Sequence, residues 1–173
     1  MTEKPVRTIK TPRGAFVMRP ETPDDDPFLF RLFLSHNAGT LRLAGLPEDV
    51  IEKLITFQFR SQTSTYRAMY PDAIYSIVEF EGEPIGRFIE QDETDMVYFV
   101  DFLLFPENRT KGLGSALTRA LMQEWAAKGR GTRVKVLMNN VASLTMCRKL
   151  GFSEEPEAGG YIDMKWSPKA QGG

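Results

Sequence analysis

The spacing of hydrophobic and polar residues changes several times along the chain, and each change predicts a switch between strand and helix. Short runs rich in β-branched and aromatic residues predict strands, whereas apolar residues that recur every three or four positions predict helices. The predicted strands are residues 15–19, 73–80, 84–91, 96–105, 133–138 and 161–166. The predicted helices are residues 28–34, 47–66, 114–128 and 141–150. The predicted order is therefore β-α-α-β-β-β-α-β-α-β.

Capping and turn residues support several of these boundaries. The acidic run at residues 24–26, followed by Pro27, is typical of a helix start, and Gly151 is typical of a helix end. A glycine-containing turn at residues 81–83 predicts that the strands on either side form a hairpin. Residues 96–105 are apolar apart from Asp101, which predicts a central strand covered on both faces.

Length and composition fit one folded domain. The chain has 173 residues, of which 42% are hydrophobic, and domains usually contain about 100 to 200 residues. We expect a flexible segment at residues 1–14, a domain at residues 15–168 and a flexible tail at residues 169–173, because both ends are polar or rich in small residues.

Charge and residue counts exclude several classes of protein. The formal net charge of -1 argues against nucleic acid as a partner. A single cysteine and a single histidine leave no set of residues with zinc-ligand spacing, so we expect no metal. No apolar run approaches the roughly 18 residues that span a bilayer, and the first residues lack a signal peptide. We therefore expect a soluble, cytoplasmic protein with no membrane partner.

A glycine-rich loop at residues 106–115 joins the predicted central strand to the third predicted helix. Such a junction favours anion binding, because a helix N-terminus exposes unpaired N–H groups and glycines let a phosphate approach the backbone. Arg109 and Lys111 add positive charge. The spacing does not fit a P-loop, and Leu117 stands where a dinucleotide fingerprint has its third small residue.

Two ordered motifs resemble the GNAT superfamily of acyl-coenzyme A dependent N-acyltransferases. The first is Arg-x-x-Gly-x-Gly at residues 109–114, and the second is the series Asn140, Ser143, Cys147 and Gly151-Phe152. The resemblance covers about residues 96–152. It implies a single α/β domain with a mixed, mainly antiparallel sheet flanked by helices on both faces. It also implies acetyl-CoA as cosubstrate, direct attack by a primary amine on the acetyl group, and a homodimer as a common state of the family.

The resemblance implies that a set of positions in this chain binds the coenzyme. They comprise the backbone of the strand before the loop, the loop itself and one face of the following helix. These positions are Phe102, Leu103, Leu104, Arg109, Thr110, Lys111, Gly112, Leu113, Gly114, Ser115, Asn140, Ser143 and Cys147.

Two residues are candidates for proton transfer. Asp101 lies in apolar surroundings that would raise its pKa, so it is a candidate base; the alternative is a structural carboxylate bonded to loop amides or paired with Arg87. Cys147 stands where most family members have the tyrosine that protonates the leaving thiolate. Its thiol is a candidate acid, and the alternative is a small buried side chain, in which case Tyr161 or a water would serve.

The acceptor has no motif of its own, so a small-molecule amine and a peptide amine are both open. The acidic run at residues 24–26 is explained either by helix capping or by attraction of a cationic acceptor. The alternative function is an acyl-CoA-binding module with a GNAT fold and weak or no transferase activity. A more remote alternative is a phosphate-binding domain for another nucleotide.

Overall fold

The computed structural model describes residues 5–156 and 159–168, so the predicted tail at residues 169–173 lies outside the described residues. Every strand and helix predicted above is present; most ends differ by at most three residues, but the helix predicted at residues 28–34 runs from Asp26 to Leu43. The strands are β1 (Arg7–Thr11), β2 (Gly14–Pro20), β3 (Ile74–Phe80), β4 (Glu83–Asp92), β5 (Met96–Leu104), β6 (Gly131–Leu137), β7 (Ser153–Pro156) and β8 (Tyr161–Trp166). The helices are η1 (Pro23–Asp25), α1 (Asp26–Leu43), α2 (Glu48–Met69), α3 (Pro106–Arg109), α4 (Leu113–Ala127) and α5 (Val141–Leu150).

The prediction of a flexible segment over residues 1–14 is wrong for its second half. Residues 7–11 form β1, which pairs antiparallel with β2 from Arg7↔Met18 to Thr11↔Gly14. Ile9 is buried in the core beneath α4, and the Arg7 guanidinium contacts Glu90 and Glu124 at 2.7 and 2.9 Å. This strand was not predicted because its sequence is mostly polar, and Ile9 is its one buried residue.

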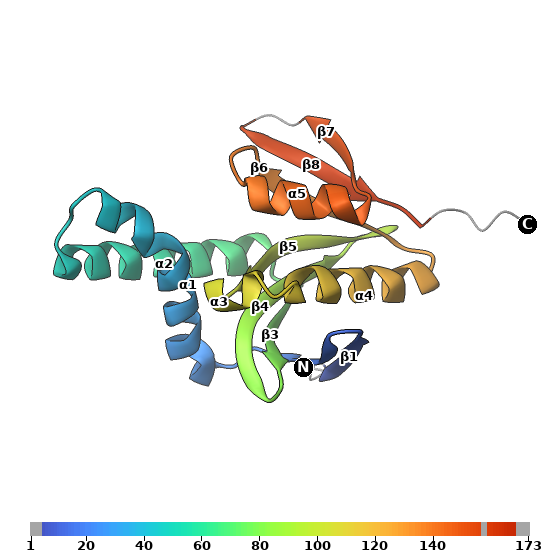
Figure 1. Ribbon diagram of the computed structural model, residues 1–173, viewed down its shortest axis with the longest axis horizontal. Helices are drawn as coiled ribbons and strands as arrows, with labels where there is room; N and C mark the ends of the chain where they lie inside the picture. Colours follow the sequence, from blue (N-terminus) through green and yellow to red (C-terminus); the bar gives the residue numbers. More distant parts are fainter. Residues whose placement is uncertain (1–4, 157–158, 169–173) are drawn as a thin grey trace, which may run out of the picture.

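The eight strands form one sheet in the order β1-β2-β3-β4-β5-β6-β8-β7, in which β5 and β6 are parallel and all other neighbours are antiparallel. The largest hydrophobic cluster packs α4 and α5 against one face of the sheet. Helices α1 and α2 supply the clusters on the other face. In Figure 1, β6, β8, β7 and α5 form the upper part of the molecule, and β3, β4, β5 and α4 lie below them.

Strands β5 and β6 separate halfway along β5. Their pairing runs from Met96↔Gly131 to Phe99↔Val134, whereas β5 stays paired with β4 as far as Leu104. The second half of β5, residues 100–104, therefore has no strand beside it on the β6 side among the described residues. The sheet is split at this point.

A β-bulge lies where the split begins. Phe99 pairs with Glu90 and Asp101 pairs with Ile89, so Val100 is the extra residue on β5. Side chains alternate between the faces of a regular strand, and an extra residue reverses that alternation. Phe99 and Phe102 accordingly both face α4, while Val100 packs with the α2 residues on the opposite face. Asp101 also lies on the α2 face, where it meets Arg87 of β4.

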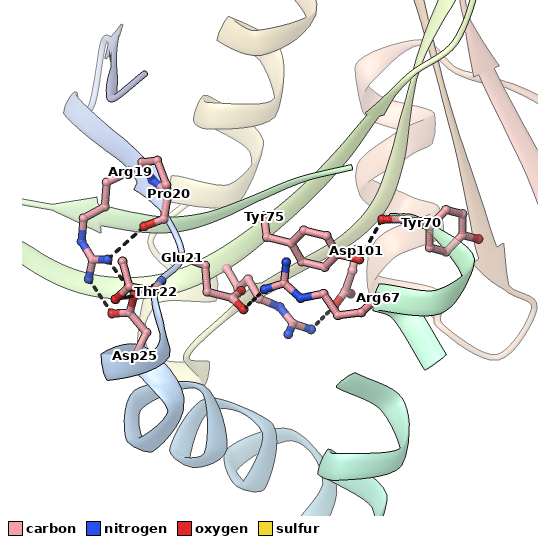
Figure 2. A network of polar contacts seen from close by, with 10 residues as sticks. Arg19, Pro20, Glu21, Thr22, Asp25, Arg67, Tyr70, Tyr75 and Asp101 are labelled. Atoms are coloured by element: carbon pink, nitrogen blue, oxygen red, sulfur yellow. Dashed lines mark hydrogen bonds and ion pairs between the residues drawn. The ribbon is translucent and has the colours of Figure 1, made fainter. Parts of the chain in front are cut away.

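Within the acidic run before α1, Asp25 forms a capping box with Thr22 at the start of the short helix η1. The Asp25 carboxylate accepts hydrogen bonds from the Thr22 backbone N–H and from the Arg19 guanidinium, at distances of 2.7–2.8 Å. Figure 2 shows Arg19, Thr22 and Asp25 close together where the chain leaves β2 and enters the helix. Helix capping therefore accounts for Asp25, and its carboxylate is already neutralised by Arg19.

Candidate active site

The split between β5 and β6 opens into a cavity of about 630 Å³. Residues from both faces of the sheet line it, so the cavity connects the α4–α5 face with the α2 face. From the α2 face come Gln62, Tyr66, Met69, Tyr70, Tyr98, Val100, Asp101, Lys135, Leu137 and Tyr161. From the α4–α5 face and the split itself come Phe99, Phe102, Thr118, Val134, Val136, Asn140, Ser143, Met146, Cys147 and Phe152.

The glycine loop leads directly into α4. Gly112 is the N-cap with φ of 71°, a left-handed conformation that favours glycine, and Leu113 begins the helix as a buried residue. A Cβ at Gly114 would lie 3.5 Å from a methyl group of Leu104, so α4 approaches the end of β5 closely. No side chain in the described part of the chain caps this helix, so its first N–H groups are available for an anion.

Arg13 is a cationic residue at this helix end that the sequence did not single out. It lies in the β1–β2 turn, which is fixed by the Thr11 hydroxyl donating to the Gly14 carbonyl at 2.9 Å. One guanidinium nitrogen of Arg13 lies 3.5 Å from the position that a Cβ would take at Gly112. No sequence pattern indicated Arg13, because its position at this helix end depends on the pairing of β1 with β2.

Arg109, predicted to meet the coenzyme, points to the end of β5. Its Nε donates to the Leu104 carbonyl at 3.1 Å, and its guanidinium also contacts His36 of α1. His36 Nε2 lies 2.9 Å from the same carbonyl, and burial lowers the pKa of His36. Arg109 and His36 thus tie α1 to the point where β5 runs into the loop.

The backbone positions predicted on β5 differ in their surroundings. A Cβ at Gly86 of β4 would lie 2.1 Å from the Leu103 carbonyl oxygen, so only glycine permits this approach of the two strands. The Leu103 carbonyl therefore faces β4 and not the split. Phe102 lines the cavity.

Asn140, Ser143 and Cys147 share one side of α5 and all line the cavity, as their spacing predicts. The Asn140 side chain caps the helix by accepting a hydrogen bond from the Ser143 N–H at 3.2 Å. Cys147 is 4% exposed and packs in the main hydrophobic cluster. Burial raises the pKa of its thiol from 9.0 to about 11, so the thiol stays protonated at neutral pH.

Asp101 is the one acidic side chain among the described residues that line the cavity. Burial raises its pKa, and the opposing effect of Arg87 does not cancel the shift. Arg87 Nη2 donates to Asp101 Oδ2 at 2.8 Å, which is the pairing that the sequence offered as a structural role. The same carboxylate lines the cavity, so pairing with Arg87 and a role in the site are compatible.

Comparison with known proteins identifies the family. A model of the acetyltransferase (GNAT) family matches residues 46–152, which is more than half of the chain. The chain therefore belongs to the GNAT acetyltransferase family, as the two motifs indicated, and acetyl-CoA is the acyl donor of that family. No curated protein matches the sequence.

Solved structures share the fold at low sequence identity. The PaiA N-acetyltransferase from Thermoplasma acidophilum in complex with coenzyme A has 18% identity and a TM-score of 0.63 over 88% of this chain and 98% of that one. RimJ from Mycobacterium smegmatis in complex with CoA-disulfide has 16% identity and a TM-score of 0.62 over 95% and 88%. A ribosomal-protein alanine N-acetyltransferase from Escherichia coli has 17% identity and a TM-score of 0.58 over 91% and 96%. The predicted single-domain α/β fold with a mixed sheet is confirmed.

Two further findings concern the described residues alone. They contain no group of three or more histidine, cysteine or acidic side chains that could hold a metal ion. No helix in this part of the chain is both long and apolar enough to cross a membrane.

Proposed function

We propose that this protein transfers an acetyl group from acetyl-CoA to a primary amine by direct attack. The observation that carries the proposal is the cavity that passes through the split sheet. Thr118 of α4 and Ser143 and Cys147 of α5 border it on one face, and Asp101 borders it on the other. A thioester held at the split would therefore be open to an amine that arrives from the α2 face.

The coenzyme-binding part of the proposal uses the predicted loop and helix positions. The N–H groups around Gly112, Leu113 and Gly114, with Thr110, Lys111 and Ser115 beside them, would hold the diphosphate. Phe102, Asn140 and Ser143 would border the pantetheine arm, because all three line the cavity. Acetyl-CoA supplies the activated acyl group when bound.

The buried hydroxyl group of Thr118 supports the proposed position of the pantetheine arm in the cavity. Thr118 of α4 lines the cavity and is 1% exposed, and its Oγ1 has no hydrogen-bond partner among the described residues. A buried hydroxyl without a partner costs about 1–3 kcal/mol. The polar pantetheine arm would supply the missing partner.

The variant Thr118→Val tests this assignment because valine keeps the shape and removes the hydroxyl. We expect the affinity for coenzyme A to fall about fivefold, since one hydrogen bond contributes about 1 kcal/mol, with no loss of stability in the free protein. Isothermal titration and thermal unfolding measure the two effects. Thr132→Val is the matched control, because Thr132 Oγ1 is also buried and has no hydrogen-bond partner among residues 5–156 and 159–168, but does not line the cavity. Equal affinities of the two variants would contradict the assignment.

Asp101 is the proposed base. An ionised carboxylate on the α2 face would accept the proton of the incoming ammonium, which gives the neutral amine that attacks the acetyl carbon. The C–N bond forms as the C–S bond breaks, the attacking nitrogen then releases its second proton to water, and the leaving thiolate takes up a proton from Tyr161, which lines the cavity, or from water. The carboxylate is held in place by Arg87, whose side chain is itself buried.

Cys147 is expected to be dispensable for turnover, although it occupies the position that the resemblance assigns to the acid. A thiol with a pKa of about 11 gives up its proton less readily than an ordinary thiol, whose pKa is about 8.5. We expect Cys147→Ala to keep kcat within about threefold, because a true general acid contributes about 10²–10⁴-fold. A 100-fold loss would instead establish Cys147 as the proton donor.

Comparison of the wild type with Cys147→Ala also tests whether burial raises the pKa of the Cys147 thiol. In the unfolded chain the thiol ionises first, so the free energy of unfolding falls as the pH rises from 9.0 to about 11. The wild type should lose about 2–3 kcal/mol relative to Cys147→Ala over this interval, as measured by chemical denaturation at each pH. Equal pH dependence of the two proteins would mean that the thiol is not desolvated.

The proposed function is tested by thiol release from acetyl-CoA in the presence of a panel of primary amines. We expect amine-dependent release together with an acetylated amine. Tight binding of acetyl-CoA without amine-dependent release would favour the acyl-CoA-binding module. Titration with ATP is the control for a general nucleotide site, and ATP should bind more weakly than coenzyme A.

A further inference from the structure

Three large apolar side chains stand exposed at the mouth of the cavity on the α2 face. Met69, Leu137 and Tyr161 are 61%, 45% and 40% exposed, and all three line the cavity. Met69 ends α2, while Leu137 and Tyr161 are register partners on β6 and β8. The mouth is therefore apolar on two opposite sides. Large exposed apolar groups that gather at one opening are typical of a binding surface.

The inner part of the same cavity has a different character. Asp101 supplies its one carboxylate among the described lining residues, and the rings of Tyr66 and Tyr70 stand on α2 with their centroids 6.2 Å apart. A carboxylate and aromatic rings both attract an ammonium group. Asp101 thus favours positive charge deep in the cavity, next to the split, whereas the exposed Lys135 of β6, which also lines the cavity two residues from Leu137, adds positive charge nearer the mouth.

The α2 wall of the cavity is fixed in place before any ligand arrives. Arg67 donates to Glu21 at 2.6 Å and lies over the Tyr75 ring at 3.7 Å, and the Tyr75 hydroxyl donates to the Tyr70 carbonyl at 3.2 Å. Figure 2 shows this chain of contacts between the end of α2 and the neighbouring strand. A preorganised wall loses little entropy on binding, so its shape and polarity select among ligands.

Resting on the proposed function, we infer that the acceptor is a primary ammonium carried on an apolar or aromatic arm, and that Met69, Leu137 and Tyr161 select it. The ammonium lies near Asp101, and the arm covers the exposed side chains at the mouth and removes them from water. A second cation on the arm would lie against apolar side chains and lose hydration without gaining a carboxylate. Diamines and polyamines are therefore poor acceptors.

A matched pair of acceptors tests the inference. Hexylamine and cadaverine have nearly the same length and differ in a terminal methyl group against a second ammonium. We expect kcat/KM for hexylamine to exceed that for cadaverine about tenfold or more, and phenethylamine to behave like hexylamine. Equal or faster acetylation of cadaverine would overturn the inference. Peptides that begin with Phe or with Lys form a second pair, in which the Phe peptide should be preferred.

Substitutions at the mouth should reverse the preference. Leu137→Asp and Met69→Asp place a carboxylate where the second ammonium of cadaverine would lie, and each is expected to lower the hexylamine-to-cadaverine ratio about tenfold. Both positions are exposed, and using two of them guards against a single folding defect. Phe57→Asp is the control, because Phe57 is also on α2 and 73% exposed but does not line this cavity. Unchanged ratios in both mouth variants would remove these residues from acceptor selection.

Binding without turnover separates this inference from the proposed function. Hexylamine and cadaverine are titrated into protein saturated with coenzyme A, which has no acyl group to transfer. Preferential binding of hexylamine supports the inference even if no amine is acetylated, and in that case only the proposed function fails. Acetylation of both amines without any preference would leave the function standing and overturn the inference.

Discussion

Replacing Asp101 by asparagine is expected to lower kcat by about 10²–10⁴-fold, which is the usual contribution of a positioned general base. Asparagine keeps the shape of the side chain but cannot accept the ammonium proton. The Asp101 carboxylate must be ionised to act, and burial raises its pKa. Activity of the wild type should therefore fall as the pH drops through that raised pKa, and this acidic limb should vanish in Asp101→Asn. Initial rates across a pH series measure both effects.

A control is needed to separate loss of the base from loss of stability, because Asp101 is also the ion-pair partner of Arg87. Asparagine leaves the buried Arg87 guanidinium without its carboxylate partner, and an unpaired buried charge costs about 3–5 kcal/mol. The double variant Arg87→Met, Asp101→Asn removes both charges and should recover stability without recovering activity. Coenzyme A affinity should stay within a few-fold of the wild type in both proteins. An Asp101→Asn variant that is folded and retains most of its activity would assign Asp101 to structure alone.

Replacing Gly114 by valine is expected to weaken coenzyme A binding by at least about 100-fold. A Cβ at this position already makes ordinary contacts with Leu104 and Phe102, at 3.5 and 3.7 Å. The two additional methyl groups of valine would push α4 away from the end of β5, and the N–H groups of the loop would lose their common orientation. Isothermal titration measures the loss.

Two controls distinguish this loss from damage to the helix. Gly114→Ala adds only the Cβ that the structure can accept, so it should bind coenzyme A within a few-fold of the wild type. Gln123→Val places the same β-branched residue at an exposed position on α4 and should bind normally, because the helix propensity cost is below about 1 kcal/mol. A folded Gly114→Val protein with unchanged affinity would refute the assignment of the loop as the diphosphate site.

Local pattern predicted most of the fold because the signals were strong over whole elements. Helix α5 was predicted as residues 141–150 and β8 as residues 161–166, and both agree with the structure. β1 was missed because its side chains are polar apart from one buried isoleucine, so its strand character comes from pairing with β2. A strand held mainly by its backbone partner leaves little trace in its own sequence.

The residues of the candidate site likewise fall into those found from sequence spacing and those found only from the structure. The motif residues of the loop and of α5 were found from their order and spacing, and Asn140, Ser143 and Cys147 share a cavity as that spacing requires. Thr118 and Arg13 were not found, because one is an unremarkable residue in an amphipathic helix and the other reaches the loop from a distant turn. Their relevance depends on contacts between segments that are remote in the chain.

Residue type and spacing within short segments were enough to predict a one-domain α/β protein of the GNAT acetyltransferase family with a glycine loop at the start of a helix. The face that each side chain of β5 occupies became known only from the three-dimensional structure. The bulge at Val100 reverses the alternation and turns Asp101 toward Arg87 and α2, while the split from β6 opens the cavity beside it. Both depend on the pairing of β5 with two other strands, and such pairing is not encoded in the local pattern of any one of them.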